Sequence, residues 1–488
     1  MSDIVSLNGY KIKDEKAVRS YDTVASMKAD TKLKEGYYVK TKGYYESNDG
    51  GHGEYVIVDD ETLVENGGSI HVLSNGLRAK LIFNDVVNVA QFGAKGDGVS
   101  DDYEAISTAL NSCKHISLLP DKTYFTSESI VLTYRNIIDG NNATIIGDGE
   151  TNYPLLYVNG TTSPAYRTKV MVNDLFLRGN NVNDGMLFNY AADFFIRNVN
   201  VYNVRYAFHF KNSLLYKFEN CLVQASDIAL YNDDTSYSVC NNIEFDKCSF
   251  VANRCVMDSV GFAFKNALFL NCEIEANNNT TGDAVIILPA TQAGTGGSSL
   301  IFEGCWFEAN VPRDILSATD QSTPISVTNC YITHPVNTAY SFAKGTDENF
   351  TIILDRCQDR SQYISGNNSK TIESTSPYVA EINCYSKYTT YNMAGATGYL
   401  NDFGMINKET INEINLVQVG STKSGQIKAS SDWVNIYAND TNGVRFPDAN
   451  YLHPLNIGGQ AFLWVYSNHL YCKVGSAPET YNDGTILL

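Results

Sequence analysis

The sequence predicts an all-β chain whose main part is a parallel β-solenoid, a coil in which each turn adds one layer of short strands. Two observations carry this prediction. The 488 residues are 43% apolar and include 32 Tyr and 22 Phe, with many Asn, Thr and Val besides, a composition that suits strands and turns better than helices. In addition, a hexapeptide with the alternating apolar pattern of a strand recurs between residues 170 and 360.

Eight such hexapeptides align, and the intervals between them indicate the fold. They begin at residues 172, 196, 218, 245, 269, 302, 327 and 354, so the intervals are 24, 22, 27, 24, 33, 25 and 27 residues. A strand-helix-strand unit needs about 30 residues or more, so most of these intervals are too short for one. A coil that closes once per 22 to 27 residues is typical of a parallel solenoid, in which each turn pairs with the next.

Six hexapeptides carry cysteine at the same position, and we expect these thiols to form one inward column with the roughly 4.8 Å spacing of paired strands. Eleven cysteines is an odd number, without C-x-x-C pairs or histidines at zinc spacing, so neither disulfides nor a metal cluster is favoured. Free cysteine packs as a small hydrophobe, so the column is predicted to fill the core. Its members are Cys221, Cys248, Cys272, Cys305, Cys330 and Cys357.

The phrases "NCEIEAN" at 271–277 and "GCWFEAN" at 304–310 are then the same strand on successive turns. The longer step of 33 residues between their cysteines indicates one turn with an extra loop. We place that loop at "PATQAGTGGSS", residues 289–299, because small and turn-forming residues dominate it.

A solenoid must cover its open strand edges, and the sequence offers a capping helix at about residues 101–113. Asp101 is the expected N-cap, with Glu104 three residues on. The preceding "GAKGDG" is not a phosphate-binding loop, because the lysine and hydroxyl of that motif are missing. The helix has an apolar face at helical spacing, formed by Ala105, Ile106, Ala109, Leu110 and Cys113.

The C-terminal hundred residues depart from the repeat. Glu381 stands where an apolar residue is needed, so we expect the solenoid to end near it. Residues 407–417 suggest a short helix, and residues 462–474 a β-hairpin with the two-residue turn "SN". A small β domain is predicted there.

Charge and hydropathy exclude some partners. The formal net charge of −18 without a dense Lys/Arg cluster argues against nucleic acid. No apolar run approaches the roughly 20 residues of a membrane span, and the N-terminus has no secretion signal. We expect a soluble chain with no membrane insertion.

Candidate catalytic residues follow from the strand alternation. If each cysteine points inward, the first and third residues after it point outward, which places Glu275 and Glu308 side by side on adjacent turns. Paired carboxylates at such a spacing are typical of glycosidases, since their mutual repulsion raises one pKa toward that of a general acid. The predicted catalytic residues are Glu275 and Glu308; the predicted substrate-binding residues are Trp306, Tyr331, Glu273 and Asp283.

Simpler interpretations of the same residues stay open. Glu-Ala-Asn can close a strand before a turn in which Asn tolerates left-handed geometry, and exposed aromatics can lie at a subunit interface. The seven histidines show no H-E-x-x-H motif, so no metal and no cofactor are predicted.

Three segments, "FGAKGDGVSDD", "ISLLPDKTYFTSESI" and "IIDGNNATIIG" at 137–147, closely resemble the opening of the pectate-lyase-like right-handed parallel β-helix superfamily, especially bacteriophage tailspikes and depolymerases. The resemblance covers about residues 85–385 and implies that the solenoid is right-handed. It further implies a virion-attachment domain at 1–84, a C-terminal β domain at 386–488 for trimerisation or glycan binding, and a homotrimer.

The resemblance also implies a function. Such a protein is made in the host cytoplasm, binds phage tail or baseplate proteins through its N-terminus, and acts from the virion on a glycan of the bacterial surface (capsule, cell-wall polysaccharide or teichoic acid). We expect glycoside hydrolysis by paired carboxylates. A receptor-binding spike without activity, a polysaccharide lyase and a teichoic acid hydrolase remain alternatives, because this family has no motif that transfers catalytic residues one by one.

Overall fold

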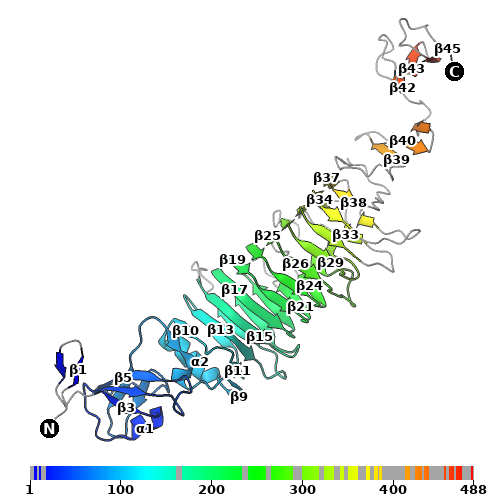
Figure 1. Cartoon of the computed structure of the whole chain (residues 1–488). Coiled ribbons are helices and arrows are strands. Elements are labelled where there is room, and N and C mark those ends of the chain that lie inside the picture. Colours follow the sequence, from blue (N-terminus) through cyan, green and yellow to red (C-terminus); the bar gives the residue numbers. More distant parts are fainter. Residues whose placement is uncertain are drawn as a thin grey trace. The chain divides into compact units, whose positions relative to one another are not determined.

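The computed structural model of the chain (Figure 1) divides into two units, residues 1–396 with 400–405 and residues 397–399 with 406–488. The first contains nearly all residues whose side chains are described. The structure describes residues 5–7, 10–12, 18–160, 168–232, 240–259, 265–288, 299–317, 324–334, 341–345, 350–360, 370–373, 378–382, 384–386, 413–417, 424–430, 433–438, 455–457, 461–466, 469–474 and 485–486.

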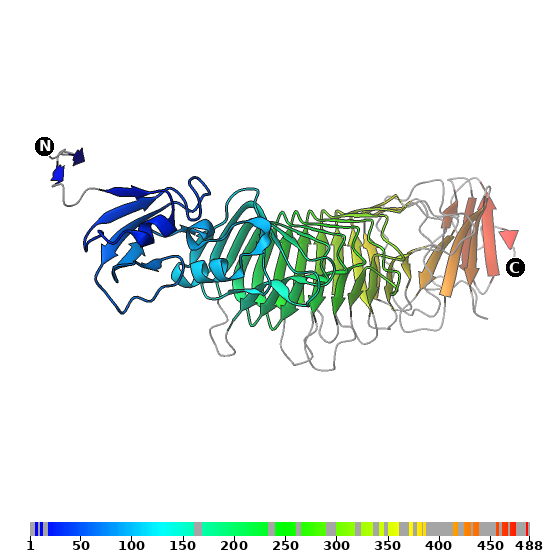
Figure 2. The ribbon, with the colours of Figure 1, turned by 90° about the horizontal axis from the view of Figure 1, so that it is seen from below.

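The parallel β-helix predicted from the repeat is confirmed: successive turns pair in parallel and form three walls. Figure 2 shows these strands lying side by side as layers. At the start, three long strands span the first and second walls together: β13 (Ile137–Ile146), β15 (Met171–Arg178) and β17 (Ala192–Tyr202). The short strands next to the capping helix precede them in the same sheet: β8 (Val87–Asn88), β9 (Asp97–Asp101), β10 (His115–Ser117) and β11 (Thr123–Phe125).

After β17 the two walls have separate strands. The first wall continues with β19 (Leu214–Glu219), β22 (Asn241–Asp246), β25 (Lys265–Leu270), β28 (Leu300–Glu303), β31 (Pro324–Thr328), β34 (Thr351–Asp355) and β37 (Tyr378–Ile382). The second wall continues with β20 (Leu222–Gln224), β23 (Ser249–Val251), β26 (Glu273–Glu275), β29 (Trp306–Glu308), β32 (Tyr331–Thr333), β35 (Gln358–Asp359) and β38 (Tyr385–Ser386).

The third wall is a separate ten-stranded parallel sheet. Its strands are β12 (Ile130–Leu132), β14 (Pro154–Asn159), β16 (Asp184–Asn189), β18 (Tyr206–Lys211), β21 (Ile228–Asn232), β24 (Cys255–Ser259), β27 (Ile286–Leu288), β30 (Ile315–Ser317), β33 (Ser341–Gly345) and β36 (Lys370–Glu373).

A left-handed residue bends the chain between the first and second walls, so each later hexapeptide is two short strands and not one. Asn220, Asn271 and Asn329 have φ of 53°, 50° and 54°, and Gly304 has 65°. Asparagine and glycine adopt this conformation at the lowest cost, which explains their place directly before cysteine.

The inward cysteine column is confirmed, since all six predicted members are buried and reduced. Each thiol contacts the backbone of the preceding turn; Cys272 Sγ donates to Phe245 O at 3.3 Å, and Cys305 Sγ to Phe269 O at 3.3 Å. Burial raises the pKa of the Cys272 thiol, which makes it a poor nucleophile. Beside the column, aromatic rings stack from turn to turn, with centroids of Phe245 and Phe269 4.8 Å apart.

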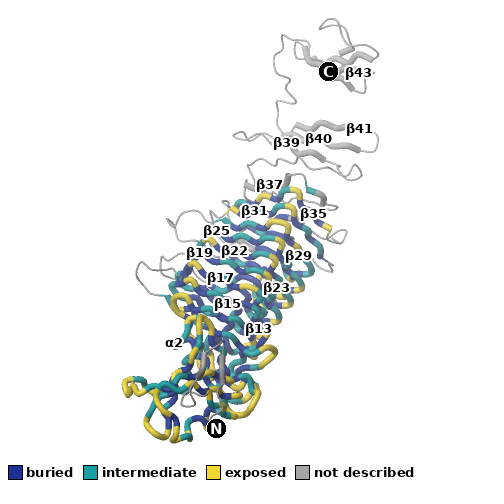
Figure 3. Tube along the Cα trace, turned by 60° about the vertical axis from the view of Figure 1, so that its left-hand side comes forward, coloured by how far each residue is buried: buried dark blue, intermediate teal, exposed yellow. Residues whose placement is uncertain are grey.

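In Figure 3, buried residues alternate with partly buried or exposed ones along the strands of the solenoid. Within the second wall the middle residue of each short strand is buried and its two neighbours are more exposed, as in Glu273–Glu275. The alternation that the sequence predicts for the three residues after cysteine is therefore confirmed.

The capping helix α2 (Tyr103–Ser112) buries Ile106, Ala109 and Leu110 against the first turns of the solenoid. Its predicted N-cap is wrong by one residue, because Asp101 ends β9 and Asp102 occupies the N-cap position. The Asp102 side chain makes no cap hydrogen bond; it accepts from the backbone N–H of Lys95 at 2.6 Å and of Gly96 at 3.1 Å, which fixes the glycine loop before the helix.

Residues before the solenoid form a small sheet that packs against it through contacts such as Tyr45 Oη donating to Gly93 O at 3.0 Å. The sheet order is β3-β4-β5-β7-β6, and a separate pair, β1 with β2, precedes it. The elements of this N-terminal part are β1 (Val5–Leu7), β2 (Tyr10–Ile12), β3 (Arg19–Tyr21), α1 (Val24–Ala29), β4 (Tyr38–Thr41), β5 (Gly53–Val58), β6 (Ile70–Val72), β7 (Arg78–Leu81) and, leading into the solenoid, the 3-10 helix η2 (Val89–Phe92).

In the second unit, the predicted hairpin is confirmed as β43 paired with β44 in antiparallel register. The predicted helix at 407–417 is wrong over 413–417, which form strand β39. The strands of this unit are β39 (Glu413–Val417), β40 (Ser424–Ser430), β41 (Trp433–Ala438), β42 (Leu455–Ile457), β43 (Ala461–Tyr466), β44 (His469–Val474) and β45 (Thr485–Ile486). Within the described residues, no helix is both long and apolar enough to cross a membrane.

Candidate functional site

The outward face of the second wall brings the predicted carboxylates together. Glu275 on β26 is the register partner of Glu308 on β29, and Glu273 is the partner of Trp306. Adjacent parallel strands lie roughly 4.8 Å apart, so the three glutamates form one acidic cluster spanning two turns. These side chains lie on the outward face, as the strand alternation predicts.

An aromatic platform adjoins the cluster. The rings of Trp306 and Tyr331 stack with centroids 4.2 Å apart and an interplanar angle of 21°, and 42% of Trp306 is exposed. The indole Nε1–H donates to Glu308 Oε2 at 2.7 Å. A flat, exposed pair of rings beside carboxylates has the shape and chemistry of a sugar-binding surface, because pyranose rings pack their apolar faces on aromatic rings.

The two central glutamates differ in their surroundings. Partial burial raises the pKa of Glu275, and the neighbouring carboxyls of Glu273 and Glu308 raise it further. Glu308 instead accepts a hydrogen bond from the Trp306 indole N–H. A carboxyl whose pKa lies above its ordinary value is what a general acid near neutral pH requires.

Asp283, the remaining predicted contact, lies apart from this cluster in the exposed turn before β27. Its backbone carbonyl accepts a hydrogen bond from Arg313 Nε at 2.8 Å. The extra loop predicted at 289–299 falls outside the described residues except for Ser299.

The repeated Glu-Ala-Asn has a structural role that differs from the one expected. Ala276 and Ala309, not the asparagines, take the left-handed conformation, with φ of 53° and 52°. The asparagine that follows is fully buried: Asn277 Oδ1 accepts from Asn253 N at 2.9 Å, and Asn277 Nδ2 donates to Asn310 Oδ1 at 2.9 Å. Asparagine suits the inside of the turn because its amide can both donate and accept a hydrogen bond at each step of this ladder.

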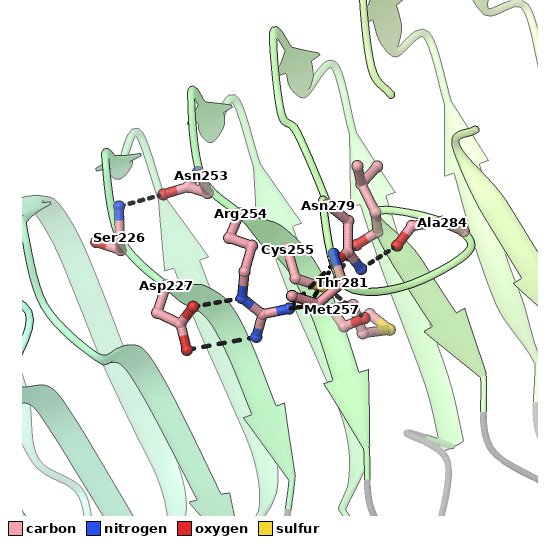
Figure 4. A network of polar contacts seen from close by, with 10 residues as sticks. Ser226, Asp227, Asn253, Arg254, Cys255, Met257, Asn279, Thr281 and Ala284 are labelled. Atoms are coloured by element: carbon pink, nitrogen blue, oxygen red, sulfur yellow. Dashed lines mark hydrogen bonds and ion pairs between the residues drawn. The ribbon is translucent and has the colours of Figure 1, made fainter. Parts of the chain in front are cut away.

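The same turns carry polar networks on the side of the third wall. In Figure 4, Ser226 N donates to Asn253 Oδ1 at 3.0 Å, and Arg254 forms a two-point ion pair with Asp227. Arg254 Nη1 also donates to Thr281 Oγ1 at 3.1 Å. These bonds join three consecutive turns, so they hold the ends of the second-wall strands in register.

Two further features of the structure are not predicted from the sequence. A cleft of about 670 Å³ lies on the outward face of the first wall, between β15 and β25, and the ion pair of Lys217 Nζ with Glu244 Oε1 at 2.8 Å crosses its lining. Its other lining residues come from the starts of five successive strands, including Asp193, Phe195 and Leu268. Hexapeptide alignment does not reveal a cleft, because the cleft depends on side-chain size in neighbouring turns.

The second missed feature is a buried cluster at the start of the third wall. Arg205 contacts both carboxylate oxygens of Asp184 at 2.9 Å, and His209 Nδ1 lies 3.4 Å from Asp184 Oδ2. Burial favours protonated Asp184, but hydrogen bonds with His209 and Arg205 outweigh it and lower its pKa. In the sequence, this cluster is indicated only by the separation of Asp184 and Arg205, which is about the length of one solenoid turn.

Among the described residues, no group of three or more His, Cys, Asp and Glu side chains is arranged to hold a metal ion.

Two family descriptions match separate parts of the chain. Residues 86–286 match the rhamnogalacturonase A/epimerase family, pectate lyase-like. Residues 20–84 match the phage tail protein small four-stranded β-sheet domain, which coincides with the small sheet of β3–β7.

Solved structures share the fold at low sequence identity. The enzymatically active domain of bacteriophage CBA120 tailspike protein 2 has a TM-score of 0.60 at 13% identity, covering 83% of this chain and 64% of that one. Tailspike protein 4 of the same phage has a TM-score of 0.60 at 16% identity, covering 83% and 59%. The chain thus spans less than two thirds of the length of either structure.

The tailspike gp49 of Acinetobacter baumannii bacteriophage Fri1, described as a capsular polysaccharide depolymerase, has a TM-score of 0.53 at 12% identity, covering 84% of this chain and 81% of that one. At these identities the likeness establishes the fold. The chain therefore contains a segment that matches a phage tail β-sheet domain, followed by a segment that matches a pectate-lyase-like family, and its parallel β-helix has the same fold as these tailspike structures.

Proposed function

We propose that the protein is a phage tailspike that binds a bacterial surface polysaccharide and depolymerises it by glycoside hydrolysis. Glu275 is the general acid, and Glu308 is the base or nucleophile. The observation that carries this proposal is the register pairing of these carboxyls next to the stacked rings of Trp306 and Tyr331. The raised pKa of Glu275 suits a group that must deliver a proton near neutral pH.

The remaining parts take roles consistent with this proposal. The rings of Trp306 and Tyr331 hold sugar faces, and Glu273 binds hydroxyl groups and keeps Glu275 protonated. Asp283, in the exposed segment between β26 and β27, contacts a part of the glycan beyond the acidic cluster. Residues 1–84 attach the spike to the phage tail, and residues 386–488 support a homotrimer or bind glycan. The matching tail domain at 20–84 and the depolymerase description of the Fri1 tailspike support this assignment.

The test uses the full chain with purified capsule, cell-wall polysaccharide and teichoic acid from candidate hosts. Cleavage appears as falling polymer size with new reducing ends, and an unsaturated product absorbing in the ultraviolet marks a lyase instead. We expect Glu275→Gln and Glu308→Gln each to lower kcat by roughly 10²–10⁴-fold while binding persists. Glu303→Gln, at an exposed glutamate on the neighbouring first wall, is the matched control.

Three outcomes separate the alternatives. Full activity in the glutamine variants contradicts the assignment of the site. Binding of polymer whose length never changes, in the unaltered chain, identifies a receptor-binding spike without activity. An ultraviolet-absorbing product identifies a lyase.

A further inference from the structure

The acidic cluster belongs to a longer strip that follows the solenoid axis. We define the strip as Asn200 and Tyr202 on β17, together with the first and third residue of each of β20, β23, β26, β29 and β32. Register pairing connects them without a break, since Tyr202 pairs with Gln224, Gln224 with Val251, and Val251 with Glu275. All of these side chains point outward and are partly or fully exposed.

The charge of the strip is one-sided. The residues that define it include three glutamates and no lysine or arginine. At its borders, Lys247 Nζ lies 3.7 Å from Asp246 Oδ2 and Arg254 pairs with Asp227, while the exposed Arg178 on β15 is the register partner of Tyr202. A phosphate or uronate beside the three glutamates would be repelled by them, and no cation within the strip would offset that repulsion.

A second aromatic pair marks the other end of the strip. The rings of Phe176, on β15, and Tyr202 stack with centroids 6.3 Å apart and an interplanar angle of 16°, and both are partly exposed. From β17 to β29 there are four steps, through β20, β23 and β26. At roughly 4.8 Å per step, the two aromatic platforms are on the order of 20 Å apart, which only an oligosaccharide of several sugars can bridge.

The residues between the platforms suit a neutral sugar chain. Asn200, Gln224 and Ser249 present an amide or hydroxyl group on three successive strands, each able to donate and to accept hydrogen bonds from sugar hydroxyls. Leu222 and Val251 add small apolar contacts beside them.

We propose that this strip binds a glycan whose backbone carries no negative charge, extended along the solenoid so that it contacts both aromatic platforms. The proposal rests on the proposed function and deepens it, since it names the substrate class and places a distal binding site at Tyr202. It makes teichoic acid and uronate polymers poor substrates.

The experiment compares purified full-length protein with an uncharged capsular polysaccharide, a uronate-containing capsular polysaccharide and a wall teichoic acid from each candidate host. We expect only uncharged polymers to be shortened, with a KM that changes little with salt, because screening weakens charge pairing and not ring stacking. Shortening of a teichoic acid or uronate polymer, with binding that salt weakens, overturns the proposal.

Variants test the distal site. Tyr202→Ala is expected to lower kcat/KM on the polymer about tenfold, the effect of losing about 1.4 kcal/mol, and to leave kcat/KM unchanged on the shortest oligosaccharides that the unaltered chain still cleaves. Tyr202→Phe retains the ring and should restore the unaltered rate. The matched control is Tyr231→Ala, which removes a partly exposed ring from the stacked pair with Tyr206 on the third wall.

The outcomes distinguish this proposal from the one it rests on. Cleavage of polymer with equal rates in Tyr202→Ala and the unaltered chain overturns the distal site alone. A protein that neither binds nor shortens any polymer overturns the proposed function and, with it, the strip.

Discussion

The buried asparagine ladder is predicted to carry much of the local stability around the candidate site, and Asn277→Ala tests it. The Asn277 side chain is fully buried and makes four hydrogen bonds: Nδ2 to Phe250 O and to Asn310 Oδ1, both at 2.9 Å, and Oδ1 from Asn253 N at 2.9 Å and from Asn253 Nδ2 at 3.2 Å. Alanine removes them all.

The cost follows from the groups left behind. The backbone N–H of Asn253 loses its acceptor and the carbonyl of Phe250 loses this donor, while Asn310 Oδ1 still accepts from the Asn277 N–H at 3.1 Å. Each orphaned buried group costs about 1–3 kcal/mol, so the free energy of unfolding should fall by about 2–5 kcal/mol. Asn277→Asp should lower the free energy of unfolding by as much, because the oxygen that replaces Nδ2 would face two acceptors, Phe250 O and Asn310 Oδ1.

Urea unfolding followed by far-ultraviolet circular dichroism measures this change through the midpoint and slope. Asn278→Ala is the matched control, because Asn278 is adjacent, exposed and joined to Asn253 only through its backbone N–H. The control should shift the free energy by less than about 0.5 kcal/mol. Equal midpoints for the two variants would refute the ladder as a source of stability.

Three other substitutions have defined expectations. Ala276→Gly should raise the free energy of unfolding by up to about 1 kcal/mol, because glycine adopts φ of 53° without the Cβ clash; a lower urea midpoint contradicts this. Burial raises the pKa of Asp102 to about 6, so between about pH 4 and 6 the folded chain keeps a proton that the unfolded chain has lost. The free energy of unfolding therefore falls as pH rises through that window. Asp102→Asn should remove about 1–2 kcal/mol of this pH dependence, which is less than the full shift implies because water screens part of it. Glu273→Gln should move the alkaline limb of the depolymerisation rate to lower pH, since Glu273 helps to raise the pKa of Glu275; an unmoved limb would argue against Glu275 as the acid.

The sequence predicted the features that depend on alternation. Side chains of a strand alternate in direction, and one buried position per strand fixes the rest, so Cys272 alone places Glu273 and Glu275 outside. Parallel pairing of equivalent turns then makes Glu275 and Glu308 neighbours. These inferences needed no knowledge of the turns.

The features that depend on backbone conformation could not be predicted in the same way. The phrase Glu-Ala-Asn suggested a left-handed asparagine from propensity, but alanine takes that conformation because burial of the Asn277 amide in the ladder repays the strain. The N-cap moved from Asp101 to Asp102 because the Asp102 carboxylate binds the N–H groups of the preceding loop, a contact without a sequence signal. Of the distal pair, Phe176 lies in a hexapeptide without cysteine and Tyr202 directly follows another, where the alignment drew no attention to outward residues.

The two roles of Glu-Ala-Asn are connected physically. A catalytic carboxyl must be held within a fraction of an ångström, yet the second-wall strands are only three residues long. The left-handed alanine turns the chain immediately after each glutamate, and the following asparagine anchors that turn to the next one. Loosening the ladder should therefore alter the spacing of Glu275 and Glu308, so Asn277→Ala is expected to lower kcat more than KM even at temperatures where the variant is fully folded. Unchanged kcat in a destabilised variant would show that the ladder serves stability alone.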